Sequence, residues 1–294
     1  ILTIMSLIKT DLKNALRLNF LCALAIISLG NLGNAETLVI EASMDTSLYS
    51  EGSLSNGQGI SIFAGRTKEG NDRRGLVKFD LEGQLPQTAS INSVTLALYV
   101  SKVPIGGGPD TFFRIHRLTR DWGEGASDAG DIGGKGAPAE AGDATWQDSE
   151  LGVQAWTQPG GDFDPEFSSE EVISGLGFYD WIGDGLLADV NAWLQDPASN
   201  YGWIIVGEQS LGSAARFESR HYWNEVQRPR LVIDYTNAWA GYPIDEDGVT
   251  VDTGDFLGRV YIEHDPWIYV YSLSKYIYMP VDGMEATGTW IWLP

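Results

Sequence analysis

The stretch N-D-R-R-G-L-V-K-F-D-L at residues 71–81 alternates between two kinds of side chain and predicts a β-strand. One face carries the positions expected to be buried, Gly75, Val77, Phe79 and Leu81. The other face carries Arg74, Leu76, Lys78 and Asp80. A strand with one apolar face is typical of a two-layer β protein, in which that face packs against a second sheet.

Segments on both sides of residues 71–81 show the same pattern. We expect further strands at 37–42, 60–64, 90–103, 112–118, 202–207, 214–219 and 230–235. Residues 186–194 have helical spacing and end before Pro197, whereas 123–143 and 157–171 lack periodicity and are expected to be irregular. The pattern predicts an all-β fold, a jelly-roll-like antiparallel β-sandwich with one short helix.

Composition supports a large β domain with an acidic surface. The 294 residues include 35 Gly and 11 Trp, and 40 acidic residues stand against 19 basic ones. Without residues 1–35, which hold three basic and one acidic residue, 16 basic and 39 acidic residues are left. A negative field of this size opposes nucleic acid and anionic membrane surfaces, so neither is an expected partner.

The N-terminal segment has the layout of a signal peptide. Lys9, Lys13 and Arg17 precede an apolar run at 18–29, and Gly33 and Ala35 supply small residues before Glu36. The apolar run is too short for a membrane span, so we interpret 1–35 as a signal peptide of a secreted, extracellular or cell-surface protein. The single cysteine lies in this segment, which leaves residues 36–294 without disulfides.

The sequence pattern changes after residue 236. Short aromatic strands are expected at 260–262, 267–271, 276–280 and 290–294, separated by turns. This spacing predicts a hairpin meander. We therefore divide the chain into a signal peptide at 1–35, a β-sandwich domain at 36–236 and an aromatic-rich C-terminal module at 237–294.

Residues 36–236 resemble the DNRLRE domain, also classified as carbohydrate-binding module family 96. The resemblance is carried by short motifs in a consistent order: D-T at 45–46, the turn at Gly65, R-R-G-L-V-K-F-D-L at 73–81, I-N-S-V-T-L-A-L-Y-V at 91–100, residues 115–124 with Trp122, A-T-W at 144–146, D-V at 189–190, Trp193, Y-G-W at 201–203, F-E-S-R at 217–220 and P-R-L-V at 229–232.

This resemblance implies a β-sandwich that binds polysaccharide, alginate among the ligands. The family pattern often continues with Arg-Glu where this chain has Arg220 and His221, so its ligand specificity is expected to differ. The tryptophans that match the family pattern, Trp122, Trp146 and Trp193, are expected in the core.

Candidate ligand-binding residues combine aromatic rings, which stack on sugar C–H faces, with groups that bind carboxylates. The set is Arg73, Arg74, Lys78, Tyr99, Arg114, His116, Trp156, Arg220, His221 and Trp223. Trp156 and Trp223 are expected to be exposed because their surroundings are polar. For Arg74 and Arg220, a structural salt bridge to one of the many carboxylates is an alternative of equal weight to ligand binding.

No catalytic motif is present, and we expect no enzyme activity and no cofactor. By analogy, jelly-roll sugar-binding domains often hold a structural Ca²⁺, for which Asp45, Asp80, Asp143 and Asp189 are the candidates. The leading hypothesis is a secreted polysaccharide-binding protein for a uronate-containing glycan. The alternatives are a structural or adhesive surface protein that attaches to the envelope or to itself through 237–294, and a polysaccharide lyase that uses His116 or His221.

Overall fold

The computed structural model describes residues 35–86, 89–104, 111–130, 133–245 and 247–279. The segment interpreted as a signal peptide, apart from Ala35, and the strand expected at 290–294 lie outside the described residues. Within the described part, no helix is long and apolar enough to cross a membrane.

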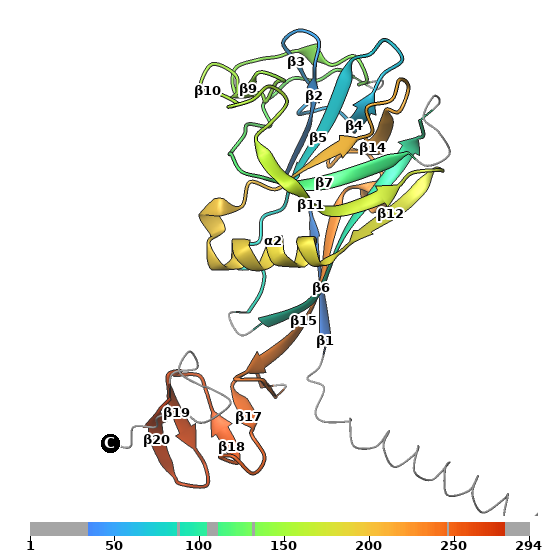
Figure 1. The fold of residues 1–294 in the computed structure, drawn as a ribbon. Helices are drawn as coiled ribbons and strands as arrows, with labels where there is room; N and C mark the ends of the chain where they lie inside the picture. Colours follow the sequence, from blue (N-terminus) through green and yellow to red (C-terminus); the bar gives the residue numbers. More distant parts are fainter. Residues whose placement is uncertain (1–34, 87–88, 105–110, 131–132, 246, 280–294) are drawn as a thin grey trace, which may run out of the picture. The chain divides into compact units, whose positions relative to one another are not determined.

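The described chain is mostly β-structure with one α-helix, which confirms the predicted fold class (Figure 1). The strands of the first unit are β1 (Ala35–Glu41), β2 (Met44–Tyr49), β3 (Leu54–Ser55), β4 (Ser61–Arg66), β5 (Asp72–Lys78), β6 (Ala89–Lys102), β7 (Phe112–Leu118), β8 (Ala137–Pro138), β9 (Asp148–Glu150), β10 (Gln154–Ala155), β11 (Phe163–Val172), β12 (Gly177–Ile182), β13 (Trp203–Gly207), β14 (Ala215–Glu218) and β15 (Arg230–Trp239).

Helical segments are few in this unit. They are α2 (Asp184–Gln195) and the 3-10 turns η1 (Pro197–Ser199) and η2 (Glu225–Gln227). The helix contains the predicted segment 186–194, and Pro197 begins the 3-10 turn that follows it. Leu186, Val190 and Trp193 bury its apolar side.

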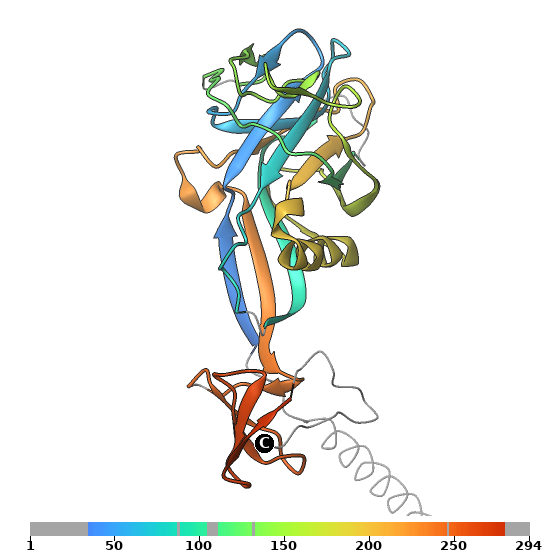
Figure 2. The same cartoon turned by 90° about the vertical axis from the view of Figure 1, so that its left-hand side faces the viewer.

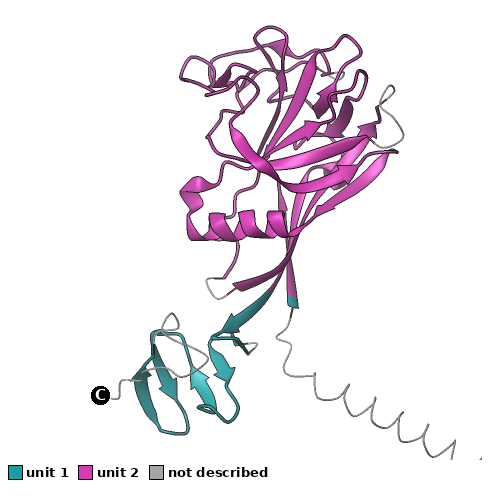
Figure 3. Ribbon diagram, viewed as in Figure 1, with its two compact units in different colours: residues 1–35, 236–294 teal, residues 36–235 magenta. Residues whose placement is uncertain are grey.

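Contacts divide the chain into two compact units (Figure 3). One is Glu36–Tyr235, and the other contains Thr236–Pro294. In the second unit, β16 (Tyr242–Pro243) pairs with the end of β15, and β17 (Thr250–Asp252), β18 (Arg259–Tyr261), β19 (Trp267–Val270) and β20 (Lys275–Tyr278) form an antiparallel meander. Each unit has its own hydrophobic core.

In Glu36–Tyr235 a single antiparallel sheet curls into two facing layers. Its strand order is β1-β15-β6-β14-β4-β5-β13-β7-β11, with β12 added beside β6 and β2 beside β5. The long strands β1, β15 and β6 run alongside one another (Figure 2). β4 passes from one layer to the other, and Gly65 near its end has φ 104°, a conformation that favours glycine.

The core between the layers uses the predicted apolar positions. Val77, Phe79 and Leu81 from the stretch at 71–81 pack there with Val100 of β6 and Phe217 of β14. Phe79 meets Trp203 edge to face, with ring centroids 6.1 Å apart. The prediction that the odd-numbered positions of residues 75–81 form core is therefore confirmed.

The other face of β5 is not an open surface. Leu76 belongs to a second core with Leu48, Trp122, Trp156 and Ile204, and this core lies beneath loops between β7 and β11. Residues 157–171 were predicted to be irregular. This prediction is wrong for the second half of the segment, because β11 begins at Phe163 and pairs with β7. Its sequence F-D-P-E-F-S-S-E-E-V is too polar to show a strand pattern.

Candidate functional site

A pocket of about 320 Å³ lies where β4, β14 and the end of β6 meet, beside the turn that leads into β5. Its lining contains four basic residues, Lys68, Arg73, Lys102 and Arg216. Glu69 is the only acidic residue of that lining. We call this feature the basic pocket. Its volume falls in the range of small-ligand sites, and its charge is opposite to that of the chain as a whole.

Strand pairing brings the basic side chains together. Arg216 of β14 lies opposite Phe63 of β4 on one side and opposite Lys102 of β6 on the other. Its neighbours Ala215 and Phe217 point into the core, so Arg216 lies on the outer face of the layer. Phe63 also contributes to the lining but is buried, with 8% of it exposed.

A β-bulge explains why Lys102 joins Arg216. Phe217 pairs with Val100, but the next residue, Arg216, pairs with Lys102, so β6 uses one residue more than β14. A bulge of this kind re-aims the side chains that follow it. Without it, Lys102 would share the face of the buried Val100. Ser101, at the bulge, accepts a hydrogen bond from Arg216 Nε at 2.8 Å.

The four basic residues differ in how much of their charge is available. Arg73 is buried, with its guanidinium bound to Glu51 and to the Gly134 carbonyl and stacked over Tyr49 at 4.6 Å. Lys68, Lys102 and Arg216 have no ion pair within the described residues, although eight of the 14 basic residues of Glu36–Tyr235 have one. Arg73 therefore forms a wall of the pocket, while the other three offer charge to a ligand.

The chemistry of the basic pocket suits a carboxylate. A guanidinium presents a planar fork of N–H donors to the two oxygens of a carboxylate, and ammonium groups add charge from other directions. Hydrogen bonds to charged groups of this kind stabilise a complex by ~1.5–3 kcal/mol each. The exposed Lys135 follows Gly134 of the lining and adds to the positive potential at its edge.

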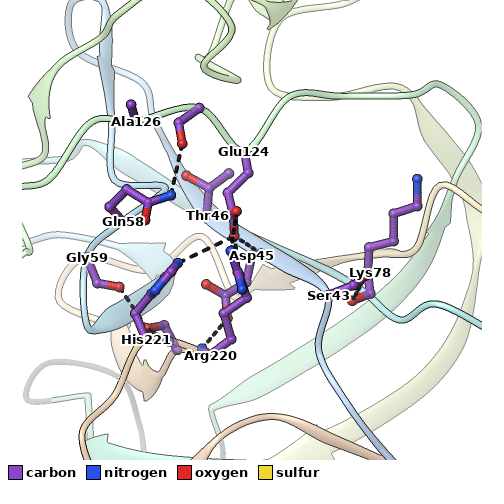
Figure 4. A network of polar contacts seen from close by, with 12 residues as sticks. Ser43, Asp45, Thr46, Gln58, Gly59, Lys78, Glu124, Ala126, Arg220 and His221 are labelled. Atoms are coloured by element: carbon purple, nitrogen blue, oxygen red, sulfur yellow. Dashed lines mark hydrogen bonds and ion pairs between the residues drawn. The ribbon is translucent and has the colours of Figure 1, made fainter.

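A second polar cluster joins residues that are far apart in the sequence (Figure 4). Glu124 accepts two hydrogen bonds from the Arg220 guanidinium, at 2.6 and 2.7 Å, and one from the Asp45 backbone N–H at 2.8 Å. The Arg220 backbone N–H donates to Asp45 Oδ2 at 2.6 Å. His221 Nε2 lies 3.9 Å from Glu124 Oε1. We call Asp45, Glu124, Arg220 and His221 the buried network, in which Asp45 is fully buried and the other three are half-buried.

The protonation states in the buried network follow from burial. Burial raises the pKa of the Asp45 carboxyl to about 8, against the lowering effect of the Arg220 backbone N–H. Burial also lowers the pKa of His221, and the adjacent Arg220 lowers it further. Arg220 already has both sides of its fork on Glu124, so the buried network is better suited to hold loops together than to bind a ligand.

The structure places the other predicted ligand residues in separate surroundings. Arg74 lies between Trp146 and Phe163 and donates to the Gly160 carbonyl at 2.6 Å. Trp156 is only 5% exposed, and its Nε1 donates to the Thr145 carbonyl at 2.8 Å. The predicted exposure of Trp156 is therefore wrong, because it fills the second core under the loops.

The predicted residues of β6 and β7 lie in two further places. Tyr99 packs edge to face on Phe178 of β12, with ring centroids 5.0 Å apart. Arg114 pairs with Glu170 of β11 at 2.6 Å. His116 is buried beside Phe163 and donates from Nδ1 to the Asp164 carbonyl. Burial lowers the pKa of His116, which favours the neutral ring.

Two predicted residues lie near open surface. Lys78 lines a larger groove of about 880 Å³ beside α2, where it pairs with Asp121 at 3.4 Å. Trp223 is 74% exposed, which confirms its predicted exposure, and it contacts only the neighbouring Tyr222 ring among the described aromatic residues. Trp122 and Trp193 are buried as expected, and Trp146 is half-buried.

The four aspartates considered for calcium do not form one site. Asp143 accepts backbone N–H groups of Ala126, Ser127 and Glu140, and Asp189 accepts from Ser168 and Trp203. These protein donors occupy the oxygens that a Ca²⁺ ion would require. Across the described segments, no group of three or more His, Cys, Asp or Glu side chains is arranged to hold a metal ion.

The chain matches no model of a known protein family, and a search of curated proteins finds no similar sequence. The resemblance of residues 36–236 to the DNRLRE domain therefore stays a prediction. Of the basic pocket, sequence analysis identified only Arg73. Lys68, Lys102 and Arg216 were missed, because three separate elements bring them together and a bulge turns one of them outward.

Proposed function

We propose that this chain is a secreted, non-catalytic protein that binds a uronate-containing polysaccharide through the basic pocket. The observation that carries the proposal is the gathering of Lys68, Lys102 and Arg216, without ion pairs in the described structure, on a chain of formal net charge −21. An acidic protein has many carboxylates that could neutralise these three side chains. None of these carboxylates pairs with the three side chains in the described structure, so their charge is available to an anionic ligand.

A uronate chain suits this pocket because of the geometry of its carboxylates. The acidic body repels a polyuronate as it repels nucleic acid and anionic membranes, so binding depends on the local positive charge of the basic pocket. A single sugar carboxylate is planar and can bind the Arg216 fork. The resemblance to the DNRLRE domain and the export-signal pattern at 1–35 support the same function.

Affinity gel electrophoresis of the full chain in alginate and in pectin tests the proposal. Wild-type protein should be retarded by at least one of these glycans. Arg216→Ala should weaken binding about tenfold, because one charge-assisted fork is lost. The combined Lys102→Ala and Arg216→Ala variant should abolish retardation.

Lys275→Ala is the matched control, because this exposed residue of the second unit has no ion pair in the described structure and its loss changes the net charge equally. It should migrate like wild type in the glycan gel. Absence of retardation in every uronate glycan would overturn the function. Retardation that survives the double substitution would overturn the assignment of the site.

A further inference from the structure

The second unit presents a row of aromatic side chains on one face of its meander. Tyr261 of β18 lies opposite Tyr269 of β19, which lies opposite Tyr276 of β20, and Trp267 lies opposite Tyr278. Directly opposed residues of an antiparallel pair share one face, so these five rings lie on the same side of the sheet. We call them the aromatic face.

The aromatic face is fixed by the packing of its reverse side. Val260, Ile268, Val270 and Ile277 alternate with the aromatic residues and are fully buried in the core of this unit. The rings therefore cannot exchange with the core without a register slip that would expose all of these aliphatic side chains.

The rings also support one another. Trp267 and Tyr278 are 5.1 Å apart between centroids, and so are Tyr269 and Tyr276. Tyr271, just beyond β19, meets Tyr269 at 5.3 Å. Neighbouring rings restrict one another's rotamers, so a ligand finds a partly ordered surface and less side-chain entropy is lost on binding.

Both the apolar faces and the polar tips of the aromatic face are accessible. Trp267, Tyr276 and Tyr278 are 40%, 43% and 37% exposed. No hydrogen bond to another described residue is made by the Trp267 indole N–H or by the hydroxyls of these tyrosines. A surface of flat apolar rings with free hydroxyl groups matches a sugar ring, which has an apolar C–H face and a rim of hydroxyls.

Charge selects the kind of partner. The described part of this unit from residue 236 onward has six acidic residues against two basic ones, and Arg259 is paired with Asp245 at 2.6 Å. Lys275, the other basic residue, lies opposite Val270 on the reverse side of the sheet, so the aromatic face itself offers no free cation to a uronate or phosphate. A second copy of the chain, itself at formal charge −21, would be repelled. A neutral ligand meets neither barrier.

We propose that the aromatic face is a second binding site, specific for a neutral polysaccharide. This site goes beyond the uronate-binding function and does not depend on the basic pocket. Rings stack on successive sugars while tyrosine hydroxyls hydrogen-bond to sugar hydroxyls, so contact is spread over several weak subsites.

The test is affinity gel electrophoresis of the full chain in neutral glycans, with hydroxyethylcellulose, galactomannan and a starch-type glucan as probes. At least one of them should retard wild-type protein. The combined Trp267→Ala and Tyr276→Ala variant should bind at least about tenfold more weakly, because truncating central aromatic contacts removes most of the binding energy.

Phe256→Ala is the matched control, since Phe256 is 47% exposed in the turn after β17, outside the strands that carry the aromatic face. It should bind like wild type, and so should the double substitution at Lys102 and Arg216. Near-ultraviolet circular dichroism and alginate retardation report whether the aromatic variant still folds.

Two results would overturn this assignment. One is a lack of retardation in every neutral glycan, even where alginate retards the protein. The other is a wild-type dimer in gel filtration that dissociates on substitution of Trp267 and Tyr276, which would make the face a contact between copies. If only the proposal for the basic pocket is wrong, the loss of retardation would appear in the uronate gels and not in the neutral-glycan gels.

Discussion

The Asp45 carboxyl lies inside the protein, fully buried, at the start of β2. Its Oδ2 accepts the Arg220 backbone N–H, while Oδ1 has no hydrogen-bond partner among the described residues. The charged form of this group is disfavoured by burial, and the neighbouring Glu124 charge disfavours it further. The folded protein therefore keeps a proton on Asp45 up to a pKa of about 8.

We expect Asp45 to make stability fall as the pH rises. Above the ordinary pKa of 3.8 the unfolded chain loses this proton, whereas the folded chain retains it up to about pH 8. In this window the folded state binds more protons, so the free energy of unfolding decreases by up to ~1.4 kcal/mol per pH unit. Asp45→Asn, which keeps a neutral acceptor for Arg220, should remove this slope.

Urea denaturation of wild type and Asp45→Asn between about pH 5 and pH 8 measures the effect. The difference in unfolding free energy should shift in favour of the variant as the pH increases. Other carboxylates contribute to both curves and cancel in the difference. Parallel curves for the two proteins would show that Asp45 is ionised in the folded state.

At the scale of elements, loops are held to the sheets by close backbone contacts. Glu124 lies between Gly123 and Gly125 in a segment with no regular structure. A Cβ on Gly123 would lie 1.9 Å from the Gly142 carbonyl oxygen, and Ala144 N–H donates to the Gly123 carbonyl at 2.8 Å. The glycine therefore allows two loop segments to touch, and this contact positions Glu124 against Arg220.

Gly123→Ala should destabilise the protein by ~3 kcal/mol, because the clash is with backbone and cannot be relieved by a rotamer change. Gly130→Ala is the control: its φ is +71°, but no atom lies within 4 Å of the added Cβ. That change should cost only ~1 kcal/mol of left-handed strain. Thermal denaturation of both variants separates the two contributions, and equal losses would contradict the close-contact explanation.

The same elements show what could be predicted from sequence. The alternation in β5 and β6 and the helical spacing at 186–194 reflect burial on one face, so these elements were predicted correctly. β11 and β12 carry polar or mixed sequences and were missed. Lys102 points outward because of the bulge at Ser101, whereas strict alternation along β6 would place it on the buried face with Val100. Arg74 and Trp156 were assigned to ligand because a loop that covers a sheet leaves no periodic signal.

At the scale of the whole molecule, strong negative charge surrounds a few unpaired cations. The two proposed sites differ in their electrostatics, since the basic pocket depends on charge and the aromatic face does not. Within each unit the separate core holds its own site in place. Ionic strength is therefore a variable that distinguishes the sites without any substitution.

Raising the salt concentration should weaken retardation by alginate and leave retardation by a neutral glycan unchanged. At about 0.1 M salt the screening length is ~10 Å, so most acidic side chains of the body already have little effect on a bound uronate. The cations of the basic pocket are within contact distance of the ligand and still act on it. Further salt, up to about 0.5 M, therefore acts mainly on this attraction, and the alginate affinity falls. Both gels run over the same salt series measure this directly, and an alginate affinity that stays constant or rises would show that the pocket charges do not hold the ligand.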